Sequence, residues 1–246
     1  MLTNARAQRG YLIDLDGTLM SGRHLLAGAR ELLARLEGRF CIVSNDSEHT
    51  PQQLVSRFAD LGIRLEASRV ILAGTCALES IARDHPGGRV MVLGSTPLRS
   101  YARRLGLDVD APHSDVVLVA RDRRFSYAKL AAAAEAVTLG AALYVACPDT
   151  SHPGASGQPV PEAGALAAAL LACTGAVDHV VIGKPQPAMF RLACQRLGID
   201  PANGVMIGDN PLTDGAGAVA IGLAFWQVVP GALDPTALFG AETEDA

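Results

Sequence analysis

Lysine is scarce in this chain of 246 residues. Only Lys129 and Lys184 are lysines among the 21 basic residues, so arginine fills nearly every basic position. The formal net charge is -4, and acidic and basic residues are mixed along the chain without a basic stripe. This distribution argues against a nucleic-acid partner and against a patch that binds anionic membranes.

Long apolar runs and closely spaced cysteines are also absent. No run of about 18 uninterrupted apolar residues occurs, which argues against a membrane-spanning helix. The polar stretch at residues 1–10 does not have the form of a signal peptide. The five cysteines are far apart, and the six histidines lack the ligand spacing of a zinc site. We therefore expect free thiols and a cytoplasmic location.

The residues that are present predict an α/β fold. Short apolar runs alternate with segments that have apolar residues at helical spacing, which indicates a parallel sheet of the Rossmann-like type. The runs expected to form strands are 11–15, 40–43, 70–72, 90–93, 116–119, 143–146, 180–182, 205–207 and 223–228. The segments expected to form helices are near 28–36, 51–61, 75–83, 97–105, 127–139, 161–172, 187–197 and 214–220. The Pro- and Gly-rich breaker at residues 85–88 separates a second, smaller α/β set from the first. Residues 147–161 are rich in Pro, Gly and Ser, and we expect a loop there.

Four short polar motifs directly follow predicted strands. They are Asp14-x-Asp16-Gly17-Thr18, Ser44-Asn45, Gly183-Lys184-Pro185 and the segment from Gly208 to Asp214. In an open parallel sheet the carboxyl ends of the strands share one edge, where ligands bind. Each motif alone is compatible with an ordinary turn, but four of them at successive strand ends predict one shared site.

The charge of these motifs predicts a metal cofactor. Asp14, Asp16, Asp209 and Asp214 would crowd one pocket, with Asp46 nearby. Each like-charge pair at about 4 Å costs on the order of 1 kcal/mol in water and about 4 at an effective dielectric constant of 20. One lysine cannot neutralise that charge, whereas a hard divalent cation with oxygen ligands can, and Mg²⁺ is the usual choice beside phosphate. A compact lysine also suits a crowded phosphate pocket better than an arginine fork does.

At these four motifs the chain resembles the haloacid-dehalogenase-like (HAD) phosphatase superfamily. About 27 residues separate Asp16 from Ser44, whereas the interval from Ser44 to Lys184 spans 140 positions. An inserted domain in the second interval resembles the C2-capped group of NagD-like, p-nitrophenyl-phosphatase-like and phosphoglycolate-phosphatase-like enzymes. The stretches DLDGTLMSGRHLLAGARE, RDRRFSYAKL, GKPQPAMF and GDNPLTDGAGAVAIGL extend the resemblance over nearly the whole chain. It implies a catalytic core at residues 1–86 and 178–246, with a C2-type cap at 87–177 that sets specificity.

The resemblance also implies a division of roles. Asp14 is the nucleophile that attacks phosphorus, and Asp16 is the acid and base, for which we expect acidic neighbours and partial burial to raise the pKa. Ser44 and Lys184 hold the phosphoryl group. Asp14, Asp209 and the Asp16 backbone carbonyl bind Mg²⁺. The supporting residues are Asp214 and Asn210.

Substrate contacts are predicted at further positions. They are Ser44, Asn45, Asp46, Asp149, His152 and Lys184. The resemblance leads us to expect a neutral residue at position 46, so Asp46 would weaken phosphate binding or select a cationic leaving group. The loop around Asp149 and His152 is either the cap loop that reaches the substrate or an ordinary surface loop. Arg121, Arg123 and Arg124 are interpreted as a solvated charge cluster, with contact to an anionic substrate as the alternative.

The predicted function is Mg²⁺-dependent hydrolysis of a small-molecule phosphomonoester through an aspartyl-phosphate intermediate. A phosphomutase or other phosphotransferase on the same core, and a non-catalytic phosphometabolite-binding protein, are the alternatives. Asp16 argues against a dehalogenase, because halide displacement does not need that acid. Sugar phosphates, glycerol phosphate, phosphoglycolate, nucleotides and pyridoxal phosphate all fit the motifs, and the family resemblance leaves a homodimer open.

Overall fold

The computed structural model describes residues 9–154, 156–230 and 233–235. The chain divides into two compact units. The first unit contains the residues up to Ser44, Val55–Val70 and the chain from Pro187 onward. The second unit contains Asn45–Leu54 and Ile71–Gln186.

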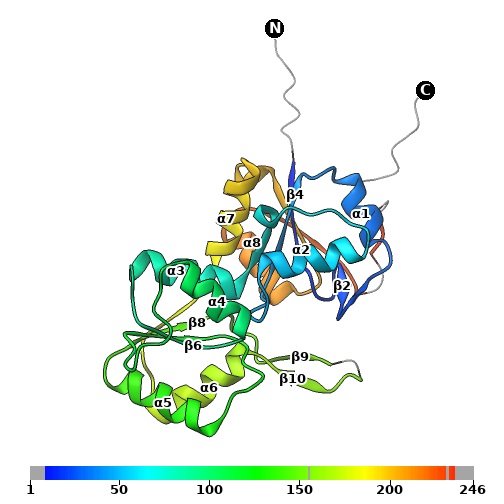
Figure 1. The fold of residues 1–246 in the computed structure, drawn as a ribbon. Helices are drawn as coiled ribbons and strands as arrows, with labels where there is room; N and C mark the ends of the chain where they lie inside the picture. Colours follow the sequence, from blue (N-terminus) through cyan, green and yellow to red (C-terminus); the bar gives the residue numbers. More distant parts are fainter. Residues whose placement is uncertain (1–8, 155, 231–232, 236–246) are drawn as a thin grey trace, which may run out of the picture. The chain divides into compact units, whose positions relative to one another are not determined.

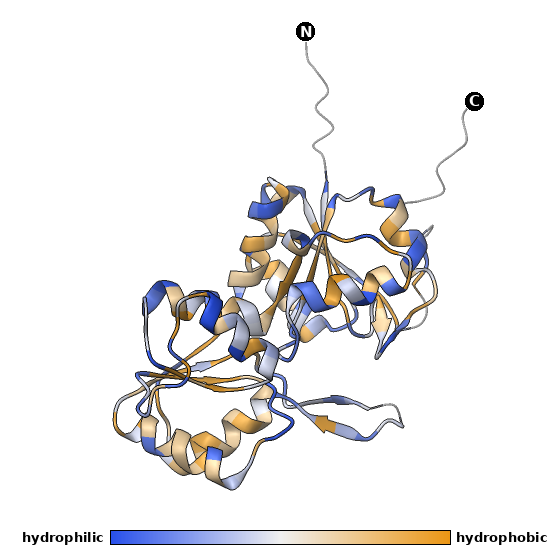
Figure 2. Ribbon diagram, in the orientation of Figure 1, coloured by the Kyte–Doolittle hydropathy of each residue, from blue (hydrophilic) through white to orange (hydrophobic). Residues whose placement is uncertain are grey.

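A five-stranded sheet forms the centre of the first unit (Figure 1). Its strand order is β13 (Ala224–Gln227), β12 (Gly204–Gly208), β1 (Gly10–Ile13), β4 (Phe40–Ser44) and β5 (Val70–Leu72). β1 runs parallel to both β12 and β4, and Ile13 pairs with Ile207 on one side and Ile42 on the other. Every residue of β1, β4 and β12 is buried. Continuous burial explains why these strands are mainly apolar, and Figure 2 shows orange at the centre of this sheet.

Helices and short turns surround this sheet. α7 (Pro187–Leu197) packs against β1 and β4, and α8 (Ala216–Ala220) packs against β13. α7 buries Met189, Phe190, Ala193 and Cys194, whose spacing places them on one helix face. The remaining elements are α1 (Ala29–Arg35), the hairpin of β2 (Met20–Ser21) and β3 (His24–Leu25), 3-10 turns at Ala67–Arg69 and Pro201–Asn203, and α2 (Pro51–Asp60), which begins in the second unit.

A four-stranded parallel sheet forms the centre of the second unit. Its order is β11 (His179–Val181), β8 (Ala142–Val145), β7 (Val116–Val119) and β6 (Val90–Leu93). α5 (Tyr127–Thr138) and α6 (Ala163–Thr174) cover one face, and α3 (Ala73–Asp84) and α4 (Thr96–Arg104) lie on the other (Figure 1). Buried aliphatic side chains from β7, β8, α5 and α6 form one continuous core.

Two short strands lie in the described parts of the segment for which the sequence predicts a loop, 147–154 and 156–161, so the expectation of a loop throughout is wrong. β9 (Ser151–Pro153) and β10 (Pro159–Pro161) form an antiparallel ribbon in which His152 pairs with Val160. The Gly154 N–H donates to the Gln158 carbonyl at 2.7 Å and closes the ribbon. The prolines concealed these strands, because a proline is tolerated only where no ladder hydrogen bond is needed.

The prediction of an α/β fold with parallel sheets is confirmed. Predicted strands and helices differ from the observed ones mostly by one or two residues at their ends. The clearest difference is at residues 214–220, where the sequence predicts one helix. The chain instead forms a π-helical turn at Pro211–Gly215 before α8 begins. None of the helices in the described part of the chain has the length and apolar character needed to cross a membrane.

Candidate active site

Three aspartates meet at the carboxyl edge of the first unit's sheet. Asp14 directly follows β1, Asp209 directly follows β12, and Asp214 lies in the π-helical turn. Each offers a carboxylate oxygen that lies within 4.8 Å of the other two. Asp14 and Asp214 are buried and Asp209 is partly buried. Because β1 and β12 are adjacent and parallel, their carboxyl ends bring these side chains together.

Two glycines make room for this aspartate cluster. Gly17 adopts a left-handed φ of 85°, and a Cβ added there would lie 2.3 Å from Asp209 Oδ2. A Cβ on Gly208 would lie 2.2 Å from Asp214 Oδ2. Both contacts are far closer than carbon and oxygen atoms tolerate. The two positions therefore require glycine, because a side chain would displace a carboxylate of the cluster.

Asn210 shapes the turn that carries Asp214. The Asp214 N–H donates to the Asn210 carbonyl at 2.9 Å, and the Asn210 N–H donates to Asp214 Oδ2 at 3.3 Å. Asn210 Oδ1 accepts a hydrogen bond from the Leu212 N–H at 2.9 Å and caps the turn. These bonds fix where the buried Asp214 carboxylate lies relative to β12.

The aspartate cluster has the donor set of a hard divalent cation. Carboxylate oxygens are the protein ligands that Mg²⁺ and Ca²⁺ prefer, and three carboxylates this close repel one another without a counter-charge. The third carboxylate beside those of Asp14 and Asp209 is that of Asp214, for which the family resemblance implies a supporting role. Asp16 is exposed, so the expected partial burial of this residue is wrong.

A second set of predicted residues lies in the second unit and is organised by Asn45. Ser44, the buried last residue of β4, leads directly into Asn45. Asn45 Oδ1 accepts a hydrogen bond from the Lys184 N–H at 2.7 Å, and Asn45 Nδ2 donates to the Lys184 carbonyl at 3.1 Å. Lys184 is only 2% exposed. A Cβ on Gly183 would lie 2.7 Å from Asn45 Oδ1, so a glycine permits this approach.

Asn45 also reaches the predicted cap loop. Its Nδ2 donates to Asp149 Oδ2 at 3.0 Å. The amide of Asn45 therefore connects the Gly-Lys-Pro turn with the segment that leads into β9, an arrangement that is not apparent from the sequence.

Asp46 is held within its own turn. Its Oδ1 accepts hydrogen bonds from the backbone N–H groups of Glu48 at 2.7 Å and His49 at 2.9 Å, and its Oδ2 lies 2.7 Å from His49 Nδ1. Burial raises the pKa of Asp46, but the hydrogen bonds and charge of His49 outweigh burial and lower the pKa below its usual range. The carboxylate is thus ionised and already has partners.

Glu162 is a partly buried acidic residue that sequence reasoning missed. Its Oε1 lies 3.3 Å from Arg121 Nη1 and 2.7 Å from His152 Nδ1, the latter without hydrogen-bond alignment. Burial raises the pKa of Glu162 to about 7, against the opposing charge of Arg121 and with help from nearby carboxylates. Burial, together with Arg121, also lowers the pKa of His152. An acidic residue before a helix is a common N-terminal signal, and nothing in the sequence marks its burial.

Comparison with known proteins identifies the family. The profile of the haloacid dehalogenase-like hydrolases matches residues 11–108, and a related HAD-hydrolase-like profile matches residues 181–245. Human chronophin is 38% identical over 228 residues, which cover 85% of this chain and 76% of chronophin. The chain belongs to the haloacid dehalogenase-like hydrolases.

Other members of this HAD family extend the comparison. The acid sugar phosphatase of Staphylococcus aureus (strain USA300) is 31% identical over 219 residues, covering 87% of this chain and 84% of that protein. The p-nitrophenyl phosphatase of Archaeoglobus fulgidus superposes with a TM-score of 0.84 at 27% identity, covering 92% of this chain and 87% of that one. The predictions of HAD membership and of a hydrolase of phosphoric monoesters are confirmed.

Proposed function

We propose that this HAD hydrolase is a Mg²⁺-dependent phosphatase that hydrolyses a small-molecule phosphomonoester through an aspartyl-phosphate intermediate formed on Asp14. The observation that carries this proposal is the aspartate cluster, in which the carboxylates of Asp14, Asp209 and Asp214 lie within 4.8 Å of one another. These three residues would hold the cation, which neutralises their charge and that of the phosphoryl group when it is bound.

The side chains of this chain divide the reaction into two displacements. A carboxylate with an ordinary pKa near 4 is ionised at neutral pH, so Asp14 needs no base to attack phosphorus. As the bond between phosphorus and the ester oxygen breaks, Asp16 gives its proton to the leaving oxygen. A water molecule then attacks the phosphorus of the acyl phosphate, Asp16 takes the proton from that water, and the Asp14 carboxylate is released with inorganic phosphate. The exposure of Asp16 supports this role, since the acid must reach a substrate that enters from solvent.

Ser44 and Lys184 are proposed to bind the transferring phosphoryl group. Lys184 contributes a positive charge, and its backbone is held on both sides by Asn45. Positioning of this kind contributes much of the rate in phosphoryl transfer, where most catalysis is orientation and charge stabilisation. Asn45 is thus proposed to act through Lys184 rather than on the substrate.

The proposed division of labour assigns residues 1–86 and 178–246 to the catalytic core and 87–177 to a substrate-selecting cap. By contact, the second compact unit reaches beyond that cap, because it also takes in Asn45–Leu54, Ile71–Pro86 and the segment up to Gln186. Asp149 and His152 are proposed to select the leaving group. The names of the acid sugar phosphatase of Staphylococcus aureus and of the p-nitrophenyl phosphatase of Archaeoglobus fulgidus support a small phosphorylated substrate.

Equilibrium metal binding tests the cofactor separately from turnover. Calorimetric titration of the chelator-treated protein with Mg²⁺ should show one site that is lost in Asp209→Asn. The exposed Asp60, at the end of α2, provides a matched control. Equal Mg²⁺ affinity in Asp209→Asn and the unaltered protein would contradict the proposed metal site.

A further inference from the structure

The second unit contains a cleft whose role the proposed reaction does not explain. Its volume is about 510 Å³, within the range of about 300–1,000 Å³ typical of small-ligand sites. Its walls come from the start of α4, from the loop after β7 and from the first turns of α5. The basic residues among its lining, together called the basic cleft here, are Arg99, Arg121, Arg123, Arg124 and Lys129.

The cleft is lined by fewer acidic than basic residues, and these acidic residues already form ion pairs. Glu48 and Asp122 are the acidic residues of the lining. Asp122 is buried, accepts a hydrogen bond from the Arg124 N–H at 2.8 Å and pairs with Lys129 Nζ at 2.5 Å. Its charge is therefore used to fold the loop and to neutralise Lys129.

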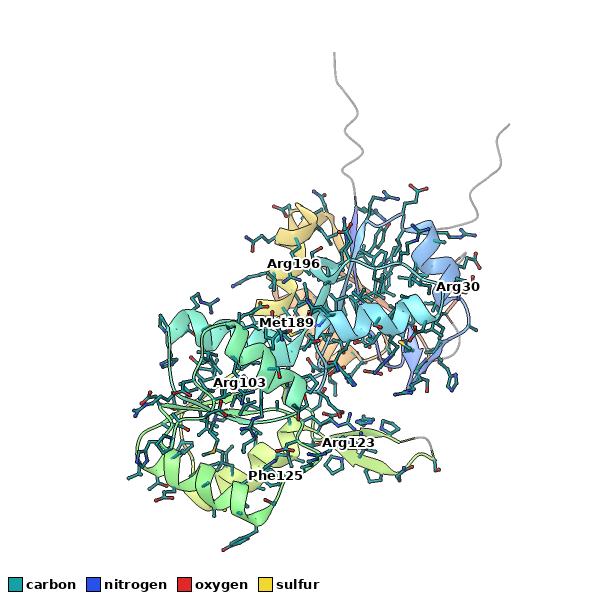
Figure 3. The ribbon with its side chains drawn as sticks, viewed as in Figure 1. Arg30, Arg103, Arg123, Phe125, Met189 and Arg196 are labelled. Carbon is teal, nitrogen blue, oxygen red and sulfur yellow. The ribbon has the colours of Figure 1, made fainter. Side chains whose placement is uncertain are left out.

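Glu48 is shared between two arginines. It lies 3.3 Å from Arg121 and 3.8 Å from Arg123, and Arg121 also lies 3.3 Å from Glu162. Figure 3 labels Arg123, whose side chain is 74% exposed. The prediction of a solvated cluster thus fails for Arg121, which is 21% exposed and held by two carboxylates.

Positive charge remains after these pairs are counted. Within the described residues, Arg99 and Arg124 have no carboxylate at ion-pair distance. Arg121 Nε is buried, and no hydrogen-bond acceptor for it lies among the described residues. A buried donor without an acceptor is uncommon in a native protein and is satisfied where a ligand supplies an oxygen.

The amino end of α4 is not the source of this preference for anions. The Ser95 hydroxyl already accepts a hydrogen bond from the Leu98 N–H and donates to the Glu48 carbonyl, and Pro97 has no N–H. The guanidinium groups therefore carry the argument. Planar guanidinium groups bind carboxylate and phosphate oxygens in pairs, and several of them around one hollow favour a ligand with more than one negative group.

We propose that the basic cleft binds a small organic anion that carries two or more phosphate or carboxylate groups. This site does not rest on the proposed phosphatase reaction, because all of its residues belong to the second unit. Two kinds of molecule could supply this anion. One is a substrate that carries a second anionic group, and the other is a separate effector.

Binding measured without metal tests the site independently of turnover. Calorimetry with citrate and with 2,3-bisphosphoglycerate would compare the full chain, Arg99→Ala/Arg124→Ala and a control, Arg64→Ala/Arg191→Ala. The control removes the same charge from exposed positions of the first unit. We expect binding of at least one probe that weakens tenfold or more in the cleft variant, stays within twofold in the control and weakens as salt is raised. The proposal would be overturned if neither probe binds, or if the cleft variant and the unaltered protein bind the probes with equal affinity.

Kinetics then separates the two sources once binding is established. If the cleft variant has a higher KM for a bisphosphorylated substrate but an unchanged KM for p-nitrophenyl phosphate, the anion is part of the substrate. If instead citrate alters p-nitrophenyl phosphate hydrolysis at fixed free Mg²⁺ in the unaltered protein and not in the cleft variant, the anion is an effector. Either result supports the site, and failure of all hydrolysis leaves the binding result unchanged.

Discussion

The side chain of Asn45 forms hydrogen bonds with both the backbone N–H and the backbone carbonyl of Lys184. Its Oδ1 accepts from the Lys184 N–H at 2.7 Å and its Nδ2 donates to the Lys184 carbonyl at 3.1 Å, across 139 positions of sequence. Lys184 is nearly fully buried, so its ammonium has little freedom to find another position. The same amide nitrogen also contacts Asp149, so one side chain orders three segments of the second unit.

Replacing Asn45 should therefore impair turnover more than substrate binding. Asn45→Ala removes both bonds to the Lys184 backbone, and we expect kcat to fall about 10- to 100-fold, the usual effect of losing a partner that orients a functional group. Steady-state kinetics with p-nitrophenyl phosphate would measure kcat and KM separately. Asn203→Ala, at an exposed position in the turn before β12, is the matched control. A kcat equal to that of the control would show that the clamp on Lys184 has no part in catalysis.

Gly17 and Gly38 allow backbone strain to be separated from crowding of the aspartate cluster. Both adopt left-handed φ values, 85° and 77°, but a Cβ at Gly38 meets nothing within 4 Å, whereas one at Gly17 meets Asp209. An alanine at either position should cost about 1–2 kcal/mol of stability from the conformation alone. Only Gly17→Ala should raise the Mg²⁺ concentration needed for half-maximal activity, by roughly tenfold. An equal Mg²⁺ requirement in the two variants would count against a cation at the aspartate cluster.

Glu162 should make stability depend on pH in a defined direction. Its pKa is raised from 4.5 to about 7 in the folded state, chiefly by burial, so between these values the folded protein binds more protons than the unfolded chain. The contribution of Glu162 to stability is therefore fully present below pH 4.5 and is lost as the pH rises to about 7. Raising a pKa by one pH unit corresponds to about 1.4 kcal/mol, so the free energy of unfolding falls by on the order of 3 kcal/mol at most.

Urea unfolding from pH 4.5 to 8 would measure this effect in Glu162→Gln, which removes the titration. We expect the variant to be less sensitive to pH and to be the more stable protein at pH 8. Glu135→Gln on the exposed face of α5 serves as the control. Parallel stability curves for Glu162→Gln and the unaltered protein would refute the assignment.

The fold was largely predictable because its signals are local. Apolar runs such as Phe40–Val43 and Val116–Val119 are too short for most helices and too apolar for surface strands, and the structure buries both as parallel strands. The aspartate cluster was predictable in the same way, since Asp14 and Asp209 each follow a strand and the topology of parallel sheets brings strand ends together.

The remaining features depend on contacts between distant segments. Nothing near Asn45 in the sequence indicates that it binds the backbone of Lys184. Likewise, nothing near Glu162 indicates that this partly buried residue lies against Arg121 and His152. The β9–β10 ribbon was missed because proline and glycine usually indicate loops, whereas here Gly154 closes the ribbon and the prolines lie at its strand ends. The π-helical turn at Asp214 likewise depends on its bonds with Asn210.

The most direct test of the proposed mechanism is hydrolysis of p-nitrophenyl phosphate by the unaltered protein, Asp14→Asn and the exposed control Asp60→Asn, each with Mg²⁺ and with chelator. We expect turnover by the unaltered protein and Asp60→Asn that stops with chelator and returns with Mg²⁺, and a loss on the order of 10³-fold or more in Asp14→Asn. Circular dichroism would establish that the nearly isosteric Asp14→Asn remains folded. Full activity in folded Asp14→Asn, or turnover that survives thorough chelation, would contradict the Mg²⁺-dependent reaction through Asp14.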